Sequence, residues 1–262
     1  MSIRNLFVLL LLVSLSACAS TPAPSGPGRF VEREVTVRGE AHRYQVFVPS
    51  RDVAPRRPAV VLFLHGSGER GADGQRQVEV GLGPHVRAHA ATFPALVVFP
   101  QARESSEWSG QLDVATAALD AAMAEFGGDP ARVYLTGLSM GGYGTWELGL
   151  REPGRFAALV PVCAGVTAPA HRPTLRVVSV DDEPDPFAAL ARGVQALPTW
   201  IFHGEVDPLV AADQSRRMQA ALEAAGATDV RYTEFPGVGH SSWDPAYAHA
   251  PLWEWLFAQR RD

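Results

Sequence analysis

Short, continuous apolar runs recur along the chain, separated by segments of helical or turn character. Such runs are typical of strands buried on both faces of a parallel sheet. They occur at residues 59–64, 95–99, 133–135, 157–162 and 199–202. Two alternating segments surround Arg38-Gly39-Glu40, at residues 30–37 and 42–48, and predict an antiparallel hairpin at the edge of the sheet. A last, alternating strand is expected at residues 230–235.

Helical periodicity fills the intervals between these strands. The expected helices cover residues 78–91, 112–126, 140–150, 214–225 and 247–260. Strands and helices therefore alternate, which predicts a single α/β domain over residues 29–262, with a mostly parallel sheet and helices on both faces. Residues 167–197 fit this alternation least well, and we expect them to form an insertion over the functional site, such as a small cap.

The sequence Gly137-Leu-Ser139-Met-Gly141 lies between a predicted strand and a predicted helix. Strand, Gly-x-Ser-x-Gly and helix form the nucleophile-elbow motif, in which a serine projects above the sheet from a strained turn. Glycine is needed on both sides of the serine because a Cβ atom would collide with neighbouring backbone. Ser139 is therefore the predicted nucleophile. A glycine-rich helix N-terminus that binds an anion is the alternative interpretation.

A serine nucleophile needs a proton acceptor and a group that orients this acceptor. His240 follows the last predicted strand in a glycine-containing loop, and Asp207 ends the strand before it. Side chains at the carboxyl ends of strands can converge above one edge of an α/β sheet. We therefore predict a catalytic triad of Ser139, Asp207 and His240.

Other residues could fill two of these roles. His65 and His203 also follow strands, but each precedes a glycine and is interpreted as supporting its loop. Asp207 could instead cap the helix that follows it. The acid could then come from a cluster after residues 175–180, if those residues formed a strand: Asp181, Asp182 or Asp185.

Acyl transfer also needs hydrogen-bond donors for the oxyanion that forms during the reaction. The expected donors are the backbone N–H of Met140, which follows the nucleophile, and the backbone N–H of Ser67 in the loop after the first parallel strand. Three aromatic residues could line a substrate pocket: Trp108, Tyr143 and Trp243. Packing is the alternative role for each of them.

Two further patterns indicate chemistry that the rest of the chain does not support. Gly66-x-Gly68-x-x-Gly71 follows a strand, as in dinucleotide-binding proteins, but residues 82–99 contain no Asp or Glu to bind a ribose. His85 and His89 have the spacing of a zinc motif but lack its glutamate. We therefore predict no cofactor and no metal.

The charged residues exclude other classes of protein. All 23 basic residues are arginine, which rules out a Walker P-loop, a Ser-Lys dyad and Schiff-base catalysis. The net charge of −5 argues against nucleic acid as a partner. The expected partner is a small-molecule or lipid-like substrate.

Residues 1–17 have the form of a signal peptide, in which Arg4 precedes a short apolar run. The run ends in Leu15-Ser-Ala-Cys18, which resembles a bacterial lipobox. The resemblance implies cleavage before Cys18 and attachment of a lipid to its thiol. Ordinary signal-peptide cleavage or an uncleaved anchor is the alternative.

A lipid on Cys18 would tether the domain through the Pro/Gly/Ser-rich linker at residues 18–28. Position 19 is Ala and not Asp, which by the sorting rule of lipoproteins implies the outer membrane, with the domain facing the periplasm. A secreted protein is the alternative. Cys163 would then have no disulfide partner, and its apolar surroundings in the sequence indicate a small buried residue.

Four motifs together resemble one branch of the α/β-hydrolase superfamily, the phospholipase/carboxylesterase and feruloyl-esterase-like branch. They lie at residues 63–71, 133–146, 202–204 and 237–247, and the resemblance spans about residues 30–260. Members of this branch are often labelled predicted peptidases. The resemblance implies a cofactor-independent carboxylic ester hydrolase with Ser139, Asp207 and His240 as its triad.

Two alternatives to an esterase remain open at this point. One is a serine peptidase acting on short peptides, because prolyl oligopeptidase shares the same core. The other is a lipoprotein that keeps the fold and binds a ligand without catalysis, although the complete set of catalytic residues argues against it. Residues 167–197 look longer than the corresponding connection in the family.

Overall fold

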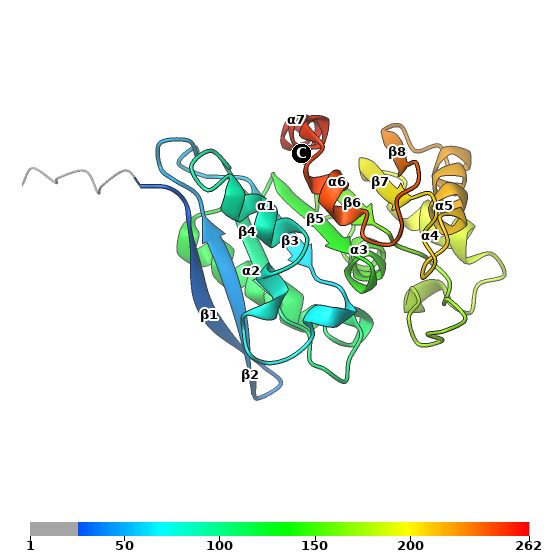
Figure 1. The fold of residues 1–262 in the computed structure, drawn as a ribbon, viewed down its shortest axis with the longest axis horizontal. Coiled ribbons are helices and arrows are strands. Elements are labelled where there is room, and N and C mark those ends of the chain that lie inside the picture. The colour runs from blue at the N-terminus through cyan, green and yellow to red at the C-terminus, as the bar shows by residue number, and fades with distance from the viewer. Residues whose placement is uncertain (1–25, 262) are drawn as a thin grey trace, which may run out of the picture.

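The computed structural model describes residues 26–261, which form one α/β domain around an eight-stranded sheet (Figure 1). The strand order is β1-β2-β4-β3-β5-β6-β7-β8. The strands are β1 (Arg29–Val37), β2 (Glu40–Val48), β3 (Val60–Leu64), β4 (Leu96–Pro100), β5 (Val133–Leu138), β6 (Ala158–Val162), β7 (Thr199–Gly204) and β8 (Val230–Phe235). The predicted fold class is confirmed.

The hairpin of β1 and β2 forms the antiparallel edge of the sheet. Its turn residues Arg38 and Gly39 both have positive φ, 51° and 82°, as a two-residue hairpin turn with the twist of the strands requires. β2 is antiparallel to β4, and all pairs from β4 to β8 are parallel. The carboxyl ends of β3, β5, β7 and β8 therefore lie along one edge of the sheet.

Helices cover both faces of the sheet, so that the domain has three layers (Figure 1). One face packs against α2 (Leu112–Phe126), α3 (Met140–Arg151), α4 (Pro186–Val194) and α5 (Asp213–Ala224). The other packs against α1 (Leu82–Ala88), α6 (Trp243–Tyr247) and α7 (Ala250–Ala258). In β3, Val60 and Leu62 belong to the first core, whereas Val61 and Phe63 belong to the second. The continuous apolar run therefore marks a strand buried on both faces, as predicted.

Two predicted helices differ in extent from those observed. Residues 78–91 do not form one helix: a 3-10 turn (Arg76–Val78) precedes α1, and Gly81 between them has a φ of 69° that interrupts helical geometry. The helix expected at residues 247–260 corresponds to α7 alone, which begins at Ala250 with Pro251 in its first turn, and the short helix α6 before it was not predicted. Periodicity alone did not reveal these boundaries.

Residues 163–185 connect β6 to α4 without forming a strand, and contain only a 3-10 turn (Val178–Val180). The acidic cluster that follows therefore does not end a strand of the sheet, and Asp185 instead caps α4 by accepting hydrogen bonds from two backbone N–H groups. α4 itself packs into the core beside α3 and α5. Of the residues expected to form an insertion, 167–197, those up to residue 185 are irregular, and residues 186–194 form α4.

The predictions for the N-terminus, the signal peptide at residues 1–17 and the lipidation of Cys18, lie outside the described residues. Within residues 26–261, no helix combines the length and the apolar character that a membrane span requires.

Candidate active site

Ser139 lies between β5 and α3 in a sharp turn with φ 52° and ψ −117°. This conformation is costly for a residue with a side chain and is stabilised only by its surroundings. A Cβ atom at Gly137 would collide with the carbonyl group of Gly141, and one at Gly141 would collide with the carbonyl group of Leu64. The two glycines therefore allow the helix to approach the strands closely, which holds the serine above the sheet.

The structure brings the three predicted triad residues together from the ends of β5, β7 and β8. His240 Nε2 lies 2.9 Å from Ser139 Oγ, and His240 Nδ1 lies 2.7 Å from Asp207 Oδ2. The imidazole side chain is 14% exposed, and the carboxylate of Asp207 is buried. The arrangement allows proton transfer from the serine hydroxyl to Nε2 while the carboxylate orients the ring.

The carboxylate of Asp207 is fully hydrogen-bonded. Oδ1 accepts from the backbone N–H groups of Leu209 and Val210 at 2.8 and 3.0 Å, while Oδ2 faces His240 and His203. Burial alone would raise the pKa of Asp207, but hydrogen bonds from His203, His240 and the Val210 N–H outweigh burial and hold the pKa well below its ordinary value. Asp207 is therefore a carboxylate at neutral pH, as the orienting role requires.

His203 is a second histidine in contact with the carboxylate of Asp207, and the sequence did not predict this contact. This residue is fully buried, and its Nε2 lies 2.9 Å from Val210 O and 3.2 Å from Asp207 Oδ2. Its Nδ1 lies 2.7 Å from Ser215 Oγ. The tautomer that satisfies all these contacts carries the proton on Nε2. The spacing of four residues between His203 and Asp207 was the available signal in the sequence.

The two backbone N–H groups expected to bind the oxyanion have no acceptor within the described residues. The N–H of Met140 belongs to the first turn of α3, where the helix dipole also favours negative charge. The N–H of Ser67 opens a 3-10 turn (Ser67–Glu69) in the loop after β3. Both groups are therefore available to a ligand near Ser139.

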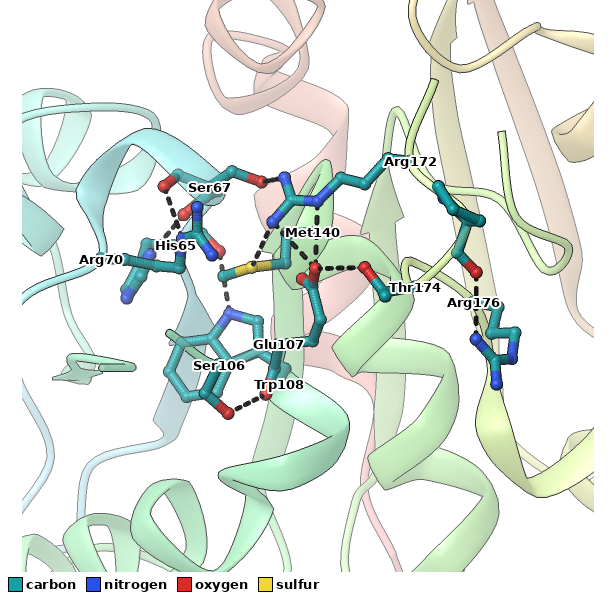
Figure 2. A network of polar contacts seen from close by, with 12 residues as sticks. His65, Ser67, Arg70, Ser106, Glu107, Trp108, Met140, Arg172, Thr174 and Arg176 are labelled. Carbon is teal, nitrogen blue, oxygen red and sulfur yellow. Dashed lines mark hydrogen bonds and ion pairs between the residues drawn. The ribbon is translucent and has the colours of Figure 1, made fainter. Parts of the chain in front are cut away.

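The loop after β3 is held by buried hydrogen bonds. His65 Nδ1 donates to Gly66 O at 2.6 Å, and His65 Nε2 accepts from the N–H of Ala102 at 3.0 Å. The indole N–H of Trp108 donates to His65 O at 2.9 Å (Figure 2). Burial lowers the pKa of His65 to about 4, so the ring is neutral at pH 7, in agreement with one donating and one accepting nitrogen.

The three aromatic residues considered for a substrate pocket have different surroundings. Trp108 is only 1% exposed and supports the loop after β3. Tyr143 is buried too, and its hydroxyl donates to Thr167 O at 3.2 Å. Trp243 is partly exposed and packs edge-on against His240, with ring centroids 5.7 Å apart. Of the three, Trp243 alone combines partial exposure with contact to the triad.

Cys163 directly follows β6 and is fully buried with a φ of 42°. Burial raises the pKa of its thiol well above the ordinary value, so the thiolate is not available as a nucleophile. Cys163 is a free cysteine in the described part of the chain, and Cys18 lies outside that part.

The two alternative motifs do not form sites in the structure. Residues 66–71 contain a single 3-10 turn and do not open an α-helix, so the strand–glycine loop–helix unit that binds dinucleotides is not formed there. The rings of His85 and His89 lie against each other at an angle of 30°, with centroids 4.3 Å apart. Between residues 26 and 261, no three or more His, Cys, Asp or Glu side chains are grouped as metal ligands would be.

A mostly parallel sheet with an antiparallel edge, helices on both faces and a serine on the turn after β5 constitute the α/β-hydrolase fold. A thermostable esterase of known structure superposes with a TM-score of 0.70 and 31% identity, over 88% of this chain and 63% of the esterase. The S-formylglutathione hydrolase FrmB of Staphylococcus aureus superposes with a TM-score of 0.66 over 88% of this chain and 98% of its own, at 17% identity.

Among curated proteins, the esterase LipQ of Mycobacterium tuberculosis is 47% identical over 47 residues. The matched segment is 18% of this chain and 11% of LipQ, and this chain spans less than two thirds of either esterase. No family model matches the sequence. The fold is that of the α/β-hydrolase superfamily, as the sequence motifs predicted, and these similarities agree with it.

Proposed function

We propose that the protein is a serine hydrolase that cleaves carboxylic esters through an acyl-enzyme intermediate. The observation that carries this proposal is the continuous chain of contacts from Ser139 Oγ through His240 to Asp207 Oδ2, at 2.9 and 2.7 Å. The esterases among its relatives support ester chemistry. The expected substrate is a small or lipid-like ester.

In the proposed reaction, Ser139 Oγ attacks the ester carbonyl carbon while His240 Nε2 takes the hydroxyl proton. The oxyanion of the tetrahedral intermediate accepts hydrogen bonds from the N–H groups of Met140 and Ser67. The imidazolium, stabilised by Asp207, then protonates the departing alcohol and leaves an acyl-serine. Water, deprotonated by His240, attacks the acyl-serine, and collapse of the second intermediate releases the acid and restores Ser139.

The proposal is tested with the purified protein, using p-nitrophenyl esters of increasing acyl length, feruloyl esters and matched amides. We expect ester turnover that falls by about 10⁴-fold or more in Ser139→Ala and by about 10⁴-fold in Asp207→Asn, which leaves the imidazole in the wrong tautomer. Ester turnover that persists in Ser139→Ala would show that this serine is not the nucleophile. Amide turnover comparable to ester turnover would identify a peptidase instead.

We also propose that the domain is tethered to the bacterial outer membrane by a lipid on Cys18. The lipobox-like sequence before Cys18 and the Pro/Gly/Ser-rich linker after it support this proposal. Metabolic labelling with a palmitate analogue should mark the wild-type protein and not Cys18→Ser. Equal labelling of both proteins, or release of the wild-type protein in soluble form, would contradict lipid attachment at this residue.

A further inference from the structure

Arg172 lies in the segment at residues 163–185 and reaches across to the loop after β3 (Figure 2). Its Nη1 donates a hydrogen bond to Ser67 Oγ. Its Nη2 lies 4.0 Å from the sulfur atom of Met140. One guanidinium therefore contacts the side chains of both residues whose backbone N–H groups are expected to bind the oxyanion.

Glu107, in the loop after β4, fixes the position of this guanidinium. Its Oε1 lies 3.0 Å from Arg172 Nε and 2.9 Å from Nη2, and also accepts from Thr174 Oγ1 at 3.2 Å. The side chains of Arg172 and Glu107 are 22% and 17% exposed, so solvent screens their attraction less than that of a surface pair. The ion pair thus connects residues 163–185 to the rest of the site.

Ser67 is held on two sides by arginine residues. Arg70, in the same loop, donates from Nε to Ser67 O at 3.0 Å, while Arg172 binds the hydroxyl group. The N–H of Ser67 has no acceptor within residues 26–261. The contacts therefore fix the carbonyl and the side chain of Ser67 and leave its N–H free to point at a ligand.

We propose that Arg172 is a positioning residue, which fixes Ser67 so that its backbone N–H is aligned with the oxyanion. This inference rests on the proposed ester hydrolysis and gives residues 163–185 a role in it. An oxyanion donor is effective when it is oriented before the reaction, since a mobile donor must be ordered in each transition state. Without Arg172, Ser67 keeps its N–H but loses the contact that orients its side chain.

The kinetic consequence follows from where the oxyanion forms. A tetrahedral intermediate arises in both acylation and deacylation, so misalignment of Ser67 slows both steps. Complete loss of an oxyanion donor lowers kcat by about 10²- to 10³-fold. We expect partial misalignment in Arg172→Ala to lower kcat by about 10-fold, with KM changed by less than about twofold, because the contact acts on the transition state.

The experiment compares four variants with the unsubstituted protein, using one neutral p-nitrophenyl ester. They are Arg172→Ala, Ser67→Ala, the double variant, and Arg176→Ala as the matched control. Arg176 belongs to the same segment but pairs with Asp181. We expect Ser67→Ala to show a loss of kcat similar to that of Arg172→Ala, and the double variant to show no further loss, because both changes remove the same hydrogen bond. The control should retain kcat within about twofold.

Two further measurements separate alignment of the oxyanion donor from stability alone. The affinity for an alkyl trifluoromethyl ketone, which adds to a serine and forms an oxyanion, should fall in Arg172→Ala by the same factor as kcat/KM. Amide hydrogen exchange at residues 66–70 should accelerate in Arg172→Ala and not in Arg176→Ala. If Arg172→Ala does not fold, Ser67→Ala provides the same test.

The inference is overturned if Arg172→Ala and Arg176→Ala have equal kcat values, or if the loss appears only in KM, which would make Arg172 a substrate-binding group. Failure of the proposed function is distinct, because the unsubstituted protein would then show no ester turnover that depends on Ser139. Hydrogen exchange at residues 66–70 still reports on the contact between Arg172 and Ser67 in that case. Unchanged exchange in Arg172→Ala would show that this contact does not fix Ser67.

Discussion

Two irregular segments border Ser139, and different kinds of interaction hold them in place. The segment at residues 65–75 is fixed from within the core. Trp108 donates to His65 O, and the side chain of Gln101 bonds to Gly74 N at 2.7 Å and Glu69 O at 3.0 Å. His65, Gln101 and Trp108 are all buried. The position of this segment therefore depends on groups that are shielded from water.

The segment at residues 163–185 is anchored in the core by apolar side chains, among them Val166, Leu175 and Val177, and its polar contacts extend from the core to the surface. Glu147, a buried carboxylate on α3, accepts from the N–H and the hydroxyl of Ser179 at 3.1 and 2.6 Å, and Tyr143 donates to Thr167 O. Within the segment, Arg176 and Asp181 form an ion pair near the surface. The comparison indicates that buried polar groups hold the first segment, whereas apolar side chains anchor the second and its outer polar contacts can open without loss of the core.

The largest loss of stability is expected when Trp108, which holds the segment at residues 65–75 from the core, is replaced. Trp108→Ala deletes a side chain that is 1% exposed and leaves the carbonyl of His65 without its indole donor. We expect a loss of about 3 to 5 kcal/mol in the free energy of unfolding, measured in urea. Trp108→Phe keeps most of the apolar surface and should lose about 1 to 3 kcal/mol. A loss below about 1 kcal/mol in Trp108→Ala would contradict the claim that buried groups hold the segment at residues 65–75.

Acidification should weaken the first segment through His65. The pKa of His65 in the folded protein is about 4 because of burial, whereas an imidazole in the unfolded chain titrates near 6.5. The unfolded state therefore takes up a proton first as the pH falls, and stability is lost between about pH 6.5 and 4, by about 3 kcal/mol from this residue. Urea unfolding across this range should be flatter in His65→Gln than in the wild type. If the free energy of unfolding changed equally with pH in both proteins, His65 would not contribute to the loss of stability in acid.

A smaller loss of stability is expected when the hydrogen bond between Ser179 and Glu147, which holds the segment at residues 163–185, is removed. Ser179→Ala removes one donor to Glu147 and should lower the free energy of unfolding by about 1 kcal/mol. Local opening should increase more than global unfolding, so trypsin should cleave after Arg176 faster. Ser105→Ala is the matched control, since this exposed hydroxyl bonds to no described residue. Equal cleavage rates in the two variants would show that Glu147 does not hold the segment.

The smallest loss of stability is expected when the exposed ion pair within residues 163–185 is removed. Arg176 and Asp181 form an ion pair with side chains 33% and 40% exposed. Arg176→Ala should change the free energy of unfolding by less than about 0.5 kcal/mol, and high salt should reduce the change further. A loss above about 1 kcal/mol would mean that the surface ion pairs secure the segment, and the two segments would then differ less than the structure indicates.

Patterns within short stretches of sequence predicted most of the fold. Continuous apolar runs marked strands buried on both faces, and the elbow was recognised because its glycines, serine and helix are adjacent in the chain. The helix expected at residues 78–91 was wrong in extent, since Gly81 adopts a φ that periodicity does not report. For the candidate site, the positions of Ser139, Asp207 and His240 after strands predicted that they could meet, and the structure brings them within hydrogen-bonding distance.

The sequence by itself determined the alternation of strands and helices and the strained turn at Ser139, because these features depend on the volume and conformational freedom of neighbouring residues. Only the tertiary structure decided that His203 shares the carboxylate of Asp207, and that Arg172 reaches Ser67 from a residue 105 positions away in the chain. Neither contact follows from local pattern, since an arginine in an irregular segment can point to many partners until the packed core fixes the path of its backbone.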